Sequence, residues 1–201
     1  MTTANSLLNK HSIISDQVSR HDLEVILGEL ENVLDRHIQG DIVEFGCYIG
    51  TTSLFIRRLL DKHNQQREFH VYDSFEGLPE KSREDGSVAG SDFRAGQLAV
   101  SKKQFIREFQ RAKLQLPVIH KGWFNEFASA DVPEQIAFAF LDGDFYESIK
   151  ASLKLVLPRM SRGGTIIIHD YAREALPGVA RAVHEHNITG VVIHGLLKID
   201  R

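Results

Sequence analysis

Apolar residues along the chain follow two spacings, one typical of helices and one typical of buried strands. From Asp22 to Ile38 they recur every three or four residues, which predicts an amphipathic helix. Further along, short continuous apolar runs end in glycine or acidic residues, as strands buried on both faces do. The pattern divides the chain into an N-terminal arm with a cap helix, residues 1–40, and a repeating strand–helix region, residues 41–201.

The second region alternates between strands and helices. The predicted strands are Asp41–Phe45, Glu68–Tyr72, Pro117–His120, Ile136–Leu141 and Thr165–Ile168, followed by a hairpin of Gly190–Ile193 and Leu196–Asp200. The predicted helices are Thr51–Lys62, Ser101–Lys113, Tyr146–Leu157 and Gly178–His186, and Gly163-Gly164 is predicted to be the turn before the fifth strand. This order indicates an α/β fold with a mostly parallel seven-stranded sheet, helices on both faces and a C-terminal antiparallel hairpin.

The composition of the chain indicates which class of protein it belongs to. Of 201 residues, 42% are hydrophobic and 25% charged, which is typical of a globular domain. The net charge of -3 provides no strong positive field for nucleic acid. The N-terminus has no signal-peptide core, no apolar run is long enough for a membrane span, and the single cysteine, Cys47, excludes an internal disulfide. We expect a cytoplasmic protein without nucleic-acid or membrane partners.

The first strand leads into a glycine loop. Ligands of parallel sheets bind beyond the carboxyl ends of the strands, where strand order reverses. Glu44 can hold a cationic amino group there, and the glycines let the main chain approach a ligand closely. The loop runs through Gly46, Cys47, Tyr48 and Gly50 to a helix that begins with Thr51 and Thr52. Its spacing differs from the G-x-G-x-x-G fingerprint, and a plain strand–helix turn is the alternative.

The next two strand ends also carry candidate ligands. Asp73, followed by Ser74, can accept both hydroxyls of a ribose, although a turn carboxylate would look the same. Gly122, Trp123 and Phe124 follow the third strand. Their aromatic rings can form one wall of an adenine slot or pack in the core.

Acidic residues follow the fourth and fifth strands. Asp142 and Asp144 follow the fourth strand, and His169 and Asp170 follow the fifth. If these strands are neighbours, their ends lie about 5 Å apart. Carboxylates gathered there are costly unless they are paired or bind a cation. Oxygen ligands favour Mg²⁺, Mn²⁺ or Ca²⁺, a histidine favours a transition metal, and acidic groups at helix N-termini are the alternative.

Together these segments resemble the macrocin-type O-methyltransferase family of class I, metal-dependent S-adenosylmethionine enzymes. The resemblance runs from about Asp41 to about His186 and rests mainly on the segments Asp73-Ser74-Phe75-Glu76-Gly77-Leu78-Pro79 and Leu141-Asp142-Gly143-Asp144-x-Tyr146-Glu147-Ser148. It implies a Rossmann-like class I methyltransferase fold, with residues 41–201 as the methyltransferase domain. The residues implied to bind S-adenosylmethionine are Glu44, Gly46, Cys47, Tyr48, Gly50, Thr51, Thr52, Asp73, Ser74, Gly122, Trp123, Phe124 and Asp142.

The resemblance further implies a divalent metal, Mg²⁺ first and Mn²⁺ as the alternative, held by Asp142, His169 and Asp170. The family usually has Asp-Asp-Tyr where this chain has His169-Asp170-Tyr171, so one negative charge is lost. The implied reaction methylates a hydroxyl of a small molecule such as a sugar. Asp142 and His169 are the predicted catalytic residues, with His169 as either metal ligand or base.

Other functions stay open at the level of sequence. An NAD-dependent oxidoreductase would be expected to carry the glycine fingerprint that this chain lacks. A non-catalytic nucleotide-binding or partner-binding α/β protein is favoured only by the histidine at position 169. Segment Ser74–Gly96 is either a lid over the acceptor or without fixed structure, and the apolar stripe near the N-terminus suits a homo-oligomer as well as packing on the sheet.

Overall fold

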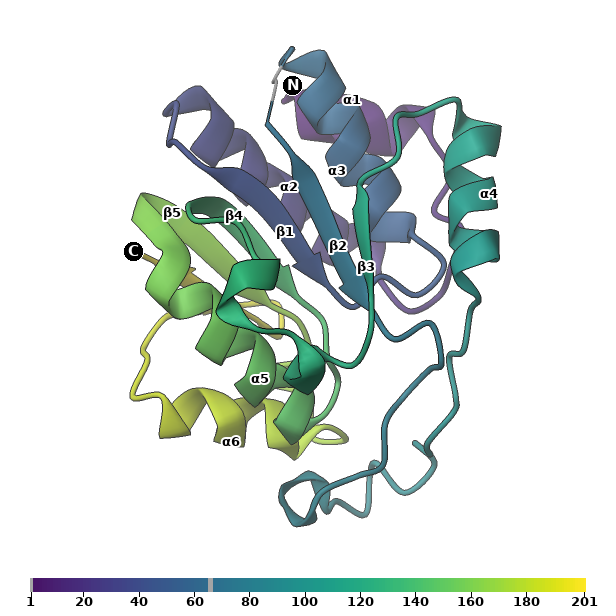
Figure 1. Cartoon of the computed structure of the whole chain (residues 1–201), viewed down its shortest axis with the longest axis vertical. Coiled ribbons are helices and arrows are strands. Elements are labelled where there is room, and N and C mark those ends of the chain that lie inside the picture. The colour runs from purple at the N-terminus through teal and green to yellow at the C-terminus, as the bar shows by residue number, and fades with distance from the viewer. Residues whose placement is uncertain (1, 65–66) are drawn as a thin grey trace.

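The computed structural model describes residues 2–64 and 67–201, so Met1 of the predicted arm lies outside the described residues. A seven-stranded sheet with strand order β3-β2-β1-β4-β5-β7-β6 forms its centre (Figure 1). Strands β1 to β5 are parallel, and β7 pairs antiparallel with both β5 and β6. The predicted α/β class, with a closing antiparallel hairpin, is confirmed.

The elements follow the predicted order with small changes at their ends. The strands are β1 (Asp41–Phe45), β2 (Phe69–Asp73), β3 (Val118–Lys121), β4 (Ile136–Leu141), β5 (Met160–Ile168), β6 (Val191–Ile193) and β7 (Leu196–Asp200). The α-helices are α1 (Thr3–Lys10), α2 (Arg20–Asp35), α3 (Thr51–Lys62), α4 (Lys102–Ala112), α5 (Tyr146–Val156) and α6 (Pro177–Glu185). Short 3-10 helices are η1 (Arg83–Asp85), η2 (Phe124–Glu126), η3 (Ser129–Asp131) and η4 (Leu157–Arg159).

Helices cover both faces of the sheet (Figure 1). Apolar residues of α1 to α4 pack in one core, and those of α5 and α6 pack in a second core on the opposite face. β4 contributes side chains to both cores: Phe138 and Phe140 pack in the first, while Ala139 and Leu141 pack in the second. This burial on both faces explains why the strand is a continuous apolar run.

The predicted turn at Gly163-Gly164 is wrong, because β5 begins at Met160 and passes through both glycines. Gly163 has a φ of +82°, and a Cβ on Gly164 would lie 2.8 Å from the carbonyl oxygen of Ala137. The pairing of β4 with β5 shifts its register between Ile136 and Phe138. The two glycines therefore permit an irregular, closely packed strand rather than a turn.

The N-terminal region packs against the first core. Ser19 caps α2 in a capping box with Asp22, and the buried stripe of α2 includes Leu23, Ile26 and Leu30. The carboxylate of Glu31 accepts hydrogen bonds from the main-chain N–H groups at the start of α1. Within residues 2–64 and 67–201, no helix combines the length and apolar character that a membrane span needs.

Candidate cofactor and metal-binding site

The strand order reverses between β1 and β4, since β2 and β3 lie on one side and β5 on the other. At such a point, the loops beyond the carboxyl ends diverge and leave a crevice. A pocket opens there over the ends of β1, β2, β4 and β5. The predicted site residues that line it are Gly46, Tyr48, Asp73, Ser74, Trp123, Phe124, Asp142, His169 and Asp170.

Close approach of β1 and β4 requires the glycine at position 46. Gly46 has a φ of +87°, and a Cβ there would lie 1.9 Å from the carbonyl oxygen of Asp142. The N–H of Asp142 donates to the carbonyl of Phe45 over 2.8 Å, which holds the two strand ends together. Gly46 thus has a packing role that is independent of any ligand.

Left-handed backbone recurs at the pocket. Four of the parallel strands are each followed by a non-glycine residue with positive φ: Tyr48 at 48°, Phe75 at 56°, Asp144 at 57° and Asp170 at 55°. This conformation is uncommon outside glycine, and it tends to cluster at functional sites because the surrounding structure must enforce it.

Glu44 is fully buried beneath the glycine loop. Its Oε2 accepts a hydrogen bond from the hydroxyl of Ser53, whereas its Oε1 makes no hydrogen bond. Burial, together with the carboxylates of Asp142 and Asp73, raises the pKa of Glu44 well above its usual value. A buried acceptor without a donor is costly, so Glu44 is suited to receive a donor or a cation from a ligand.

Asp73 connects β2 to the glycine loop. Its Oδ2 accepts from the N–H groups of Cys47 at 2.8 Å and Tyr48 at 3.2 Å, and its Oδ1 accepts from the N–H of Phe75 at 2.7 Å. The carboxylate therefore shapes two turns at once. These bonds occupy both lone pairs of Oδ2 and one of Oδ1, so Oδ1 keeps acceptor capacity for a ribose hydroxyl.

Asp142, His169 and Asp170 come together at the neighbouring ends of β4 and β5. His169 Nδ1 lies 2.9 Å from Asp142 Oδ1 and 3.3 Å from Asp170 Oδ2. Asp170 Oδ1 also accepts from Arg173 over 3.1 Å. The predicted proximity of these strand ends is confirmed, and one nitrogen and two oxygens converge there.

Negative charge dominates around His169, which is 7% exposed. Burial opposes protonation, but Asp142, Asp170 and Asp22 outweigh it and raise the pKa of His169 well above its usual value. Burial and the charges of Asp142 and Asp170 also raise the pKa of Asp144 well above its usual range. The cluster therefore holds a proton strongly, and a bound cation would compete for the same place.

Asp22 is a site residue that the sequence did not reveal. It belongs to the first turn of α2, and its Oδ2 lies 3.7 Å from Nε2 of His169. Burial opposes ionisation, but the neighbouring imidazole of His169 and hydrogen bonding with Ser19 lower the pKa of Asp22 to about 2. The capping box was the only local signal for Asp22, and that signal concerns the helix end rather than the pocket.

Segment Ser74–Gly96 is anchored along its length. The buried carboxylate of Asp85 accepts from the N–H of Tyr146 over 2.7 Å and from both the N–H and hydroxyl of Ser82. The N–H of Leu78 donates to Gln97, and Lys81 donates to Gly90. This segment therefore forms a defined wall beside the pocket.

A family model described as "Macrocin-O-methyltransferase (TylF)" matches residues 12–201 of this chain, which takes in every strand and the whole pocket. The chain belongs to the macrocin O-methyltransferase family.

Several known O-methyltransferases are similar to this chain in sequence or structure. The 8-demethyl-8-(2,3-dimethoxy-alpha-L-rhamnosyl)-tetracenomycin-C 4'-O-methyltransferase of Streptomyces olivaceus is 36% identical over 164 residues, covering 78% of this chain and 61% of the relative. The demethyldecarbamoylnovobiocin O-methyltransferase of Streptomyces niveus is 31% identical over 200 residues, covering 96% and 74%. The solved O-methyltransferase NovP superposes with a TM-score of 0.79 at 28% identity, covering 92% of this chain and 81% of that structure.

The pocket separates the predicted site residues of this family member into two groups. Glu44, Cys47, Gly50, Thr51, Thr52 and Gly122 lie outside the lining, in or beneath the loops that shape it. Phe124 lines the pocket and also packs in the core, since its ring lies edge-on against Phe45 at a centroid distance of 5.2 Å. Asp144, a member of the predicted acidic cluster, also lines the pocket. Gly77, Leu78, Pro79, Gly143 and Ser148 lie in the predicted family segments but were not assigned to a ligand, and Gln17, Leu98 and Arg173 were not singled out by the sequence.

Proposed function

We propose that this chain is an S-adenosylmethionine-dependent O-methyltransferase, assisted by a divalent cation, that acts on a sugar hydroxyl of a natural product. The observation that carries the proposal is the trio Asp142–His169–Asp170 beside a pocket at the reversal of strand order. We assign residues 41–201 to the cofactor-binding domain and residues 1–40 to the acceptor side, because Gln17 and Asp22 reach the same region.

The cofactor side of the pocket supports S-adenosylmethionine. When bound, this cofactor supplies an electrophilic methyl group. Oε1 of Glu44 is a buried acceptor without a donor, and a cationic ammonium group would satisfy it. We assign the ribose hydroxyls to Asp73, and the wall of the adenine slot to Trp123 and Phe124, which line the pocket.

The donor set of the trio fits a divalent cation. Mg²⁺ takes oxygen ligands at about 2.1 Å in octahedral geometry, which places adjacent donors about 3.0 Å apart. The observed separations of 2.9 and 3.3 Å between His169 Nδ1 and its two neighbours are close to this value. A cation held here would lower the pKa of an acceptor hydroxyl. The imidazole ligand makes Mn²⁺ the main alternative to Mg²⁺.

His169 has two possible roles, and its geometry favours one. Nδ1 belongs to the trio, and Nε2 faces the carboxylate of Asp22. A metal-bound histidine commonly donates its other N–H to a carboxylate, which orients the ring. We therefore assign His169 as a ligand through Nδ1, with Asp22 as its orienting partner. The alternative is that His169 itself takes the proton from the acceptor hydroxyl.

The acceptor class follows from the relatives, whose names specify a rhamnosyl tetracenomycin and demethyldecarbamoylnovobiocin. The match covers 61% of the first relative's length, so only the class of its acceptor is carried over to this proposal. We propose that the acceptor is a sugar hydroxyl of a glycoside that binds beside Gln17, Leu98 and Arg173, which line both this pocket and a second one.

The cofactor assignment is tested by calorimetric titration with S-adenosylhomocysteine. Glu44→Gln is the sharper variant, because Asp73 also holds two turns and its removal would disturb the loop. We expect Glu44→Gln to weaken binding at least about tenfold through loss of the charge-assisted bond. Glu31→Gln, another buried glutamate that contacts α1 instead, is the control and should bind normally. Absence of binding by the folded wild type would contradict the methyltransferase assignment.

The metal assignment is tested by methyl transfer to a panel of demethylated glycosides, with chelator and then with Mg²⁺ or Mn²⁺ restored. Loss of turnover with chelator and its recovery with metal support His169 as a ligand. Turnover that resists the chelator but disappears in His169→Ala would instead make His169 the base. An unchanged rate in both experiments would remove the trio from the reaction.

A further inference from the structure

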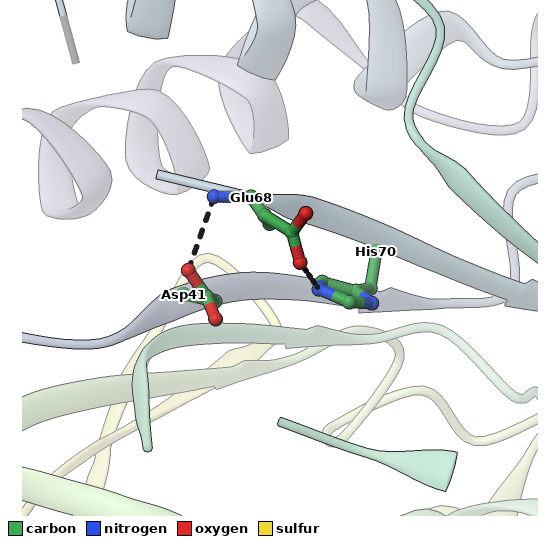
Figure 2. Close-up of side chains that lie close together, drawn as sticks. All are labelled: Asp41, Glu68 and His70. Carbon is green, nitrogen blue, oxygen red and sulfur yellow. Dashed lines mark hydrogen bonds and ion pairs between the residues drawn. The ribbon is translucent and has the colours of Figure 1, made fainter. Parts of the chain in front are cut away.

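A second cluster of one histidine and two carboxylates lies at the opposite, amino-terminal ends of the strands. Asp41 is the first residue of β1, and Glu68 and His70 are two residues apart at the start of β2. One donor atom from each of the three lies within 4.8 Å of the other two. Figure 2 shows the carboxylate of Glu68 turned toward the imidazole of His70, with Asp41 on the adjoining strand. Parallel pairing of β1 with β2 fixes this arrangement, since residues two apart on a strand face the same way.

Hydrogen bonds hold part of this cluster in place. Oδ1 of Asp41 accepts from the main-chain N–H of Glu68 over 3.0 Å (Figure 2). On its other side, His70 Nδ1 lies 3.1 Å from Nε2 of His120 on β3, and these two atoms share a hydrogen bond. Each contact leaves one atom free to bind a metal. Asp41 keeps its second carboxylate oxygen, and His70 keeps its second ring nitrogen.

The second nitrogen of His70 is the informative atom. His70 is 9% exposed, and its Nε2 is buried without a hydrogen-bond partner, although Glu68 Oε2 lies 3.3 Å away. A buried polar atom left unsatisfied costs free energy and points to a missing water or ion. If Nδ1 of His70 donates to His120, then Nε2 presents a lone pair to the carboxylate of Glu68. Two acceptors facing each other repel, unless a cation lies between them.

We propose that Asp41, Glu68 and His70 form a second metal site, for Zn²⁺ or a similar late divalent transition metal. One imidazole and two carboxylates supply three ligands of types that zinc accepts, which leaves the fourth tetrahedral position for a water. Zinc bonds of about 2.0–2.2 Å in tetrahedral geometry place neighbouring ligand atoms about 3.3–3.6 Å apart. The separation between His70 Nε2 and Glu68 Oε2 already matches, and the 67% exposed side chain of Glu68 is free to adjust. His120 would accept the other N–H of His70 and orient the ring.

This site is separate from the trio Asp142–His169–Asp170. It lies at the other end of β1, roughly 15 Å away along a five-residue strand. Nothing about it depends on the proposed methyl transfer, and its metal would tie β2 to β1 at the end where the chain leaves α3. An imidazole with carboxylates favours zinc, cobalt or nickel over Mg²⁺. The trio has the same ligand types, so the experiment must remove it as a competitor.

The experiment uses the tag-free chain carrying Asp142→Asn and Asp170→Asn, which removes the first cluster as a competitor. Co²⁺ is titrated while its visible absorption is recorded, and Zn²⁺ binding is measured by calorimetry. We expect one equivalent of each metal, an intense cobalt spectrum typical of four-coordination, and a raised melting temperature. Excess Mg²⁺ should not displace the cobalt.

Variants of the cluster distinguish metal binding at this site from metal binding at histidines elsewhere on the surface. Glu68→Gln should weaken cobalt binding at least about tenfold, and its exposed position makes misfolding a poor explanation. His70→Gln should abolish the cobalt spectrum, and the exposed Glu80→Gln is the matched control. Binding that is unchanged in Glu68→Gln, or no stoichiometric binding in the background chain, would overturn the proposal. S-adenosylhomocysteine titration of Glu68→Gln, in the chain with Asp142 and Asp170 intact, reports separately on the proposed function.

Discussion

The two ends of the sheet carry clusters of the same composition, one histidine with two carboxylates, in different surroundings. At the carboxyl ends, His169 faces three carboxylates inside a pocket, since Asp22 joins Asp142 and Asp170. At the amino ends, His70 faces one exposed carboxylate on one side and a second histidine on the other.

The difference lies in what the fold places around each imidazole. Parallel strands open into a crevice only where their order reverses, and loops with left-handed residues enclose that end. Left-handed residues also precede β1 and β2, at His37, Gly40 and Asn64, but the cluster of Asp41, Glu68 and His70 does not line the pocket at the reversal of strand order. The same residue types are therefore suited to a substrate site at one end and to a cross-link at the other.

The largest expected effect is a loss of turnover when the cluster at the carboxyl ends is changed. Asp142→Asn removes one charge from the pocket without changing the shape of the side chain. We expect turnover of a screened glycoside acceptor to fall by about 100-fold or more, as for other lost electrostatic groups in active sites. Asp35→Asn, an exposed change at the end of α2, is the control. A fall of less than threefold would remove Asp142 from the reaction.

Glycines at both ends of β1 give the second comparison. Gly46→Ala places a Cβ 1.9 Å from the carbonyl of Asp142 at a φ of +87°, whereas Gly40→Ala meets the main chain of Gln135 and Ala137 at 2.8–2.9 Å. We expect Gly46→Ala to reduce the free energy of unfolding by about 3 kcal/mol or more, and Gly40→Ala by less. Gly96→Ala has positive φ but open space, so about 1 kcal/mol is expected. Urea denaturation measures all three, and equal losses would contradict the close approach of β1 and β4.

Asp22→Asn tests the third carboxylate around His169. An amide can still accept the hydrogen bond from Ser19, so the helix cap is kept. We expect Mn²⁺ affinity at the pocket to fall about tenfold, which is the usual size for a residue that orients a ligand. Asp16→Asn, in the segment before α2, is the matched control. Unchanged affinity in Asp22→Asn would make its carboxylate a helix cap alone.

The smallest effects are pH dependences of opposite sign. Burial opposes protonation of His169, but the carboxylates of Asp142, Asp170 and Asp22 raise its pKa, so in metal-free protein its stabilisation is full below about pH 6.5 and lost as pH rises. Burial and the neighbouring His70 lower the pKa of His120, so its contribution is present above about pH 6.5 and lost as pH falls.

Urea unfolding of His169→Asn and His120→Asn across this range, with chelator present, measures both contributions. Each difference from the wild type should change by at most about 1.4 kcal/mol per pH unit. Slopes of the same sign in the two variants would contradict the contrast between the clusters.

Much of the fold could be predicted because periodicity reflects burial directly. The short continuous apolar runs predicted the strands of the sheet, and the glycine and acidic residues after them marked the pocket edge. The error at Gly163-Gly164 arose because paired glycines are typical of turns, whereas here they permit close contact with β4. That contact lies between strands, so no local pattern reports it.

The sequence by itself determined the order of elements, the family segments and the candidate residues at five strand ends, since these depend on spacing and residue type. Only the tertiary structure decided which carboxylates surround which histidine. Asp22 reaches His169 from 147 positions earlier in the chain because α2 packs across the sheet, and Asp41 meets His70 because β1 pairs with β2. Charge interactions act through space over a few ångströms, and chain order does not encode those distances.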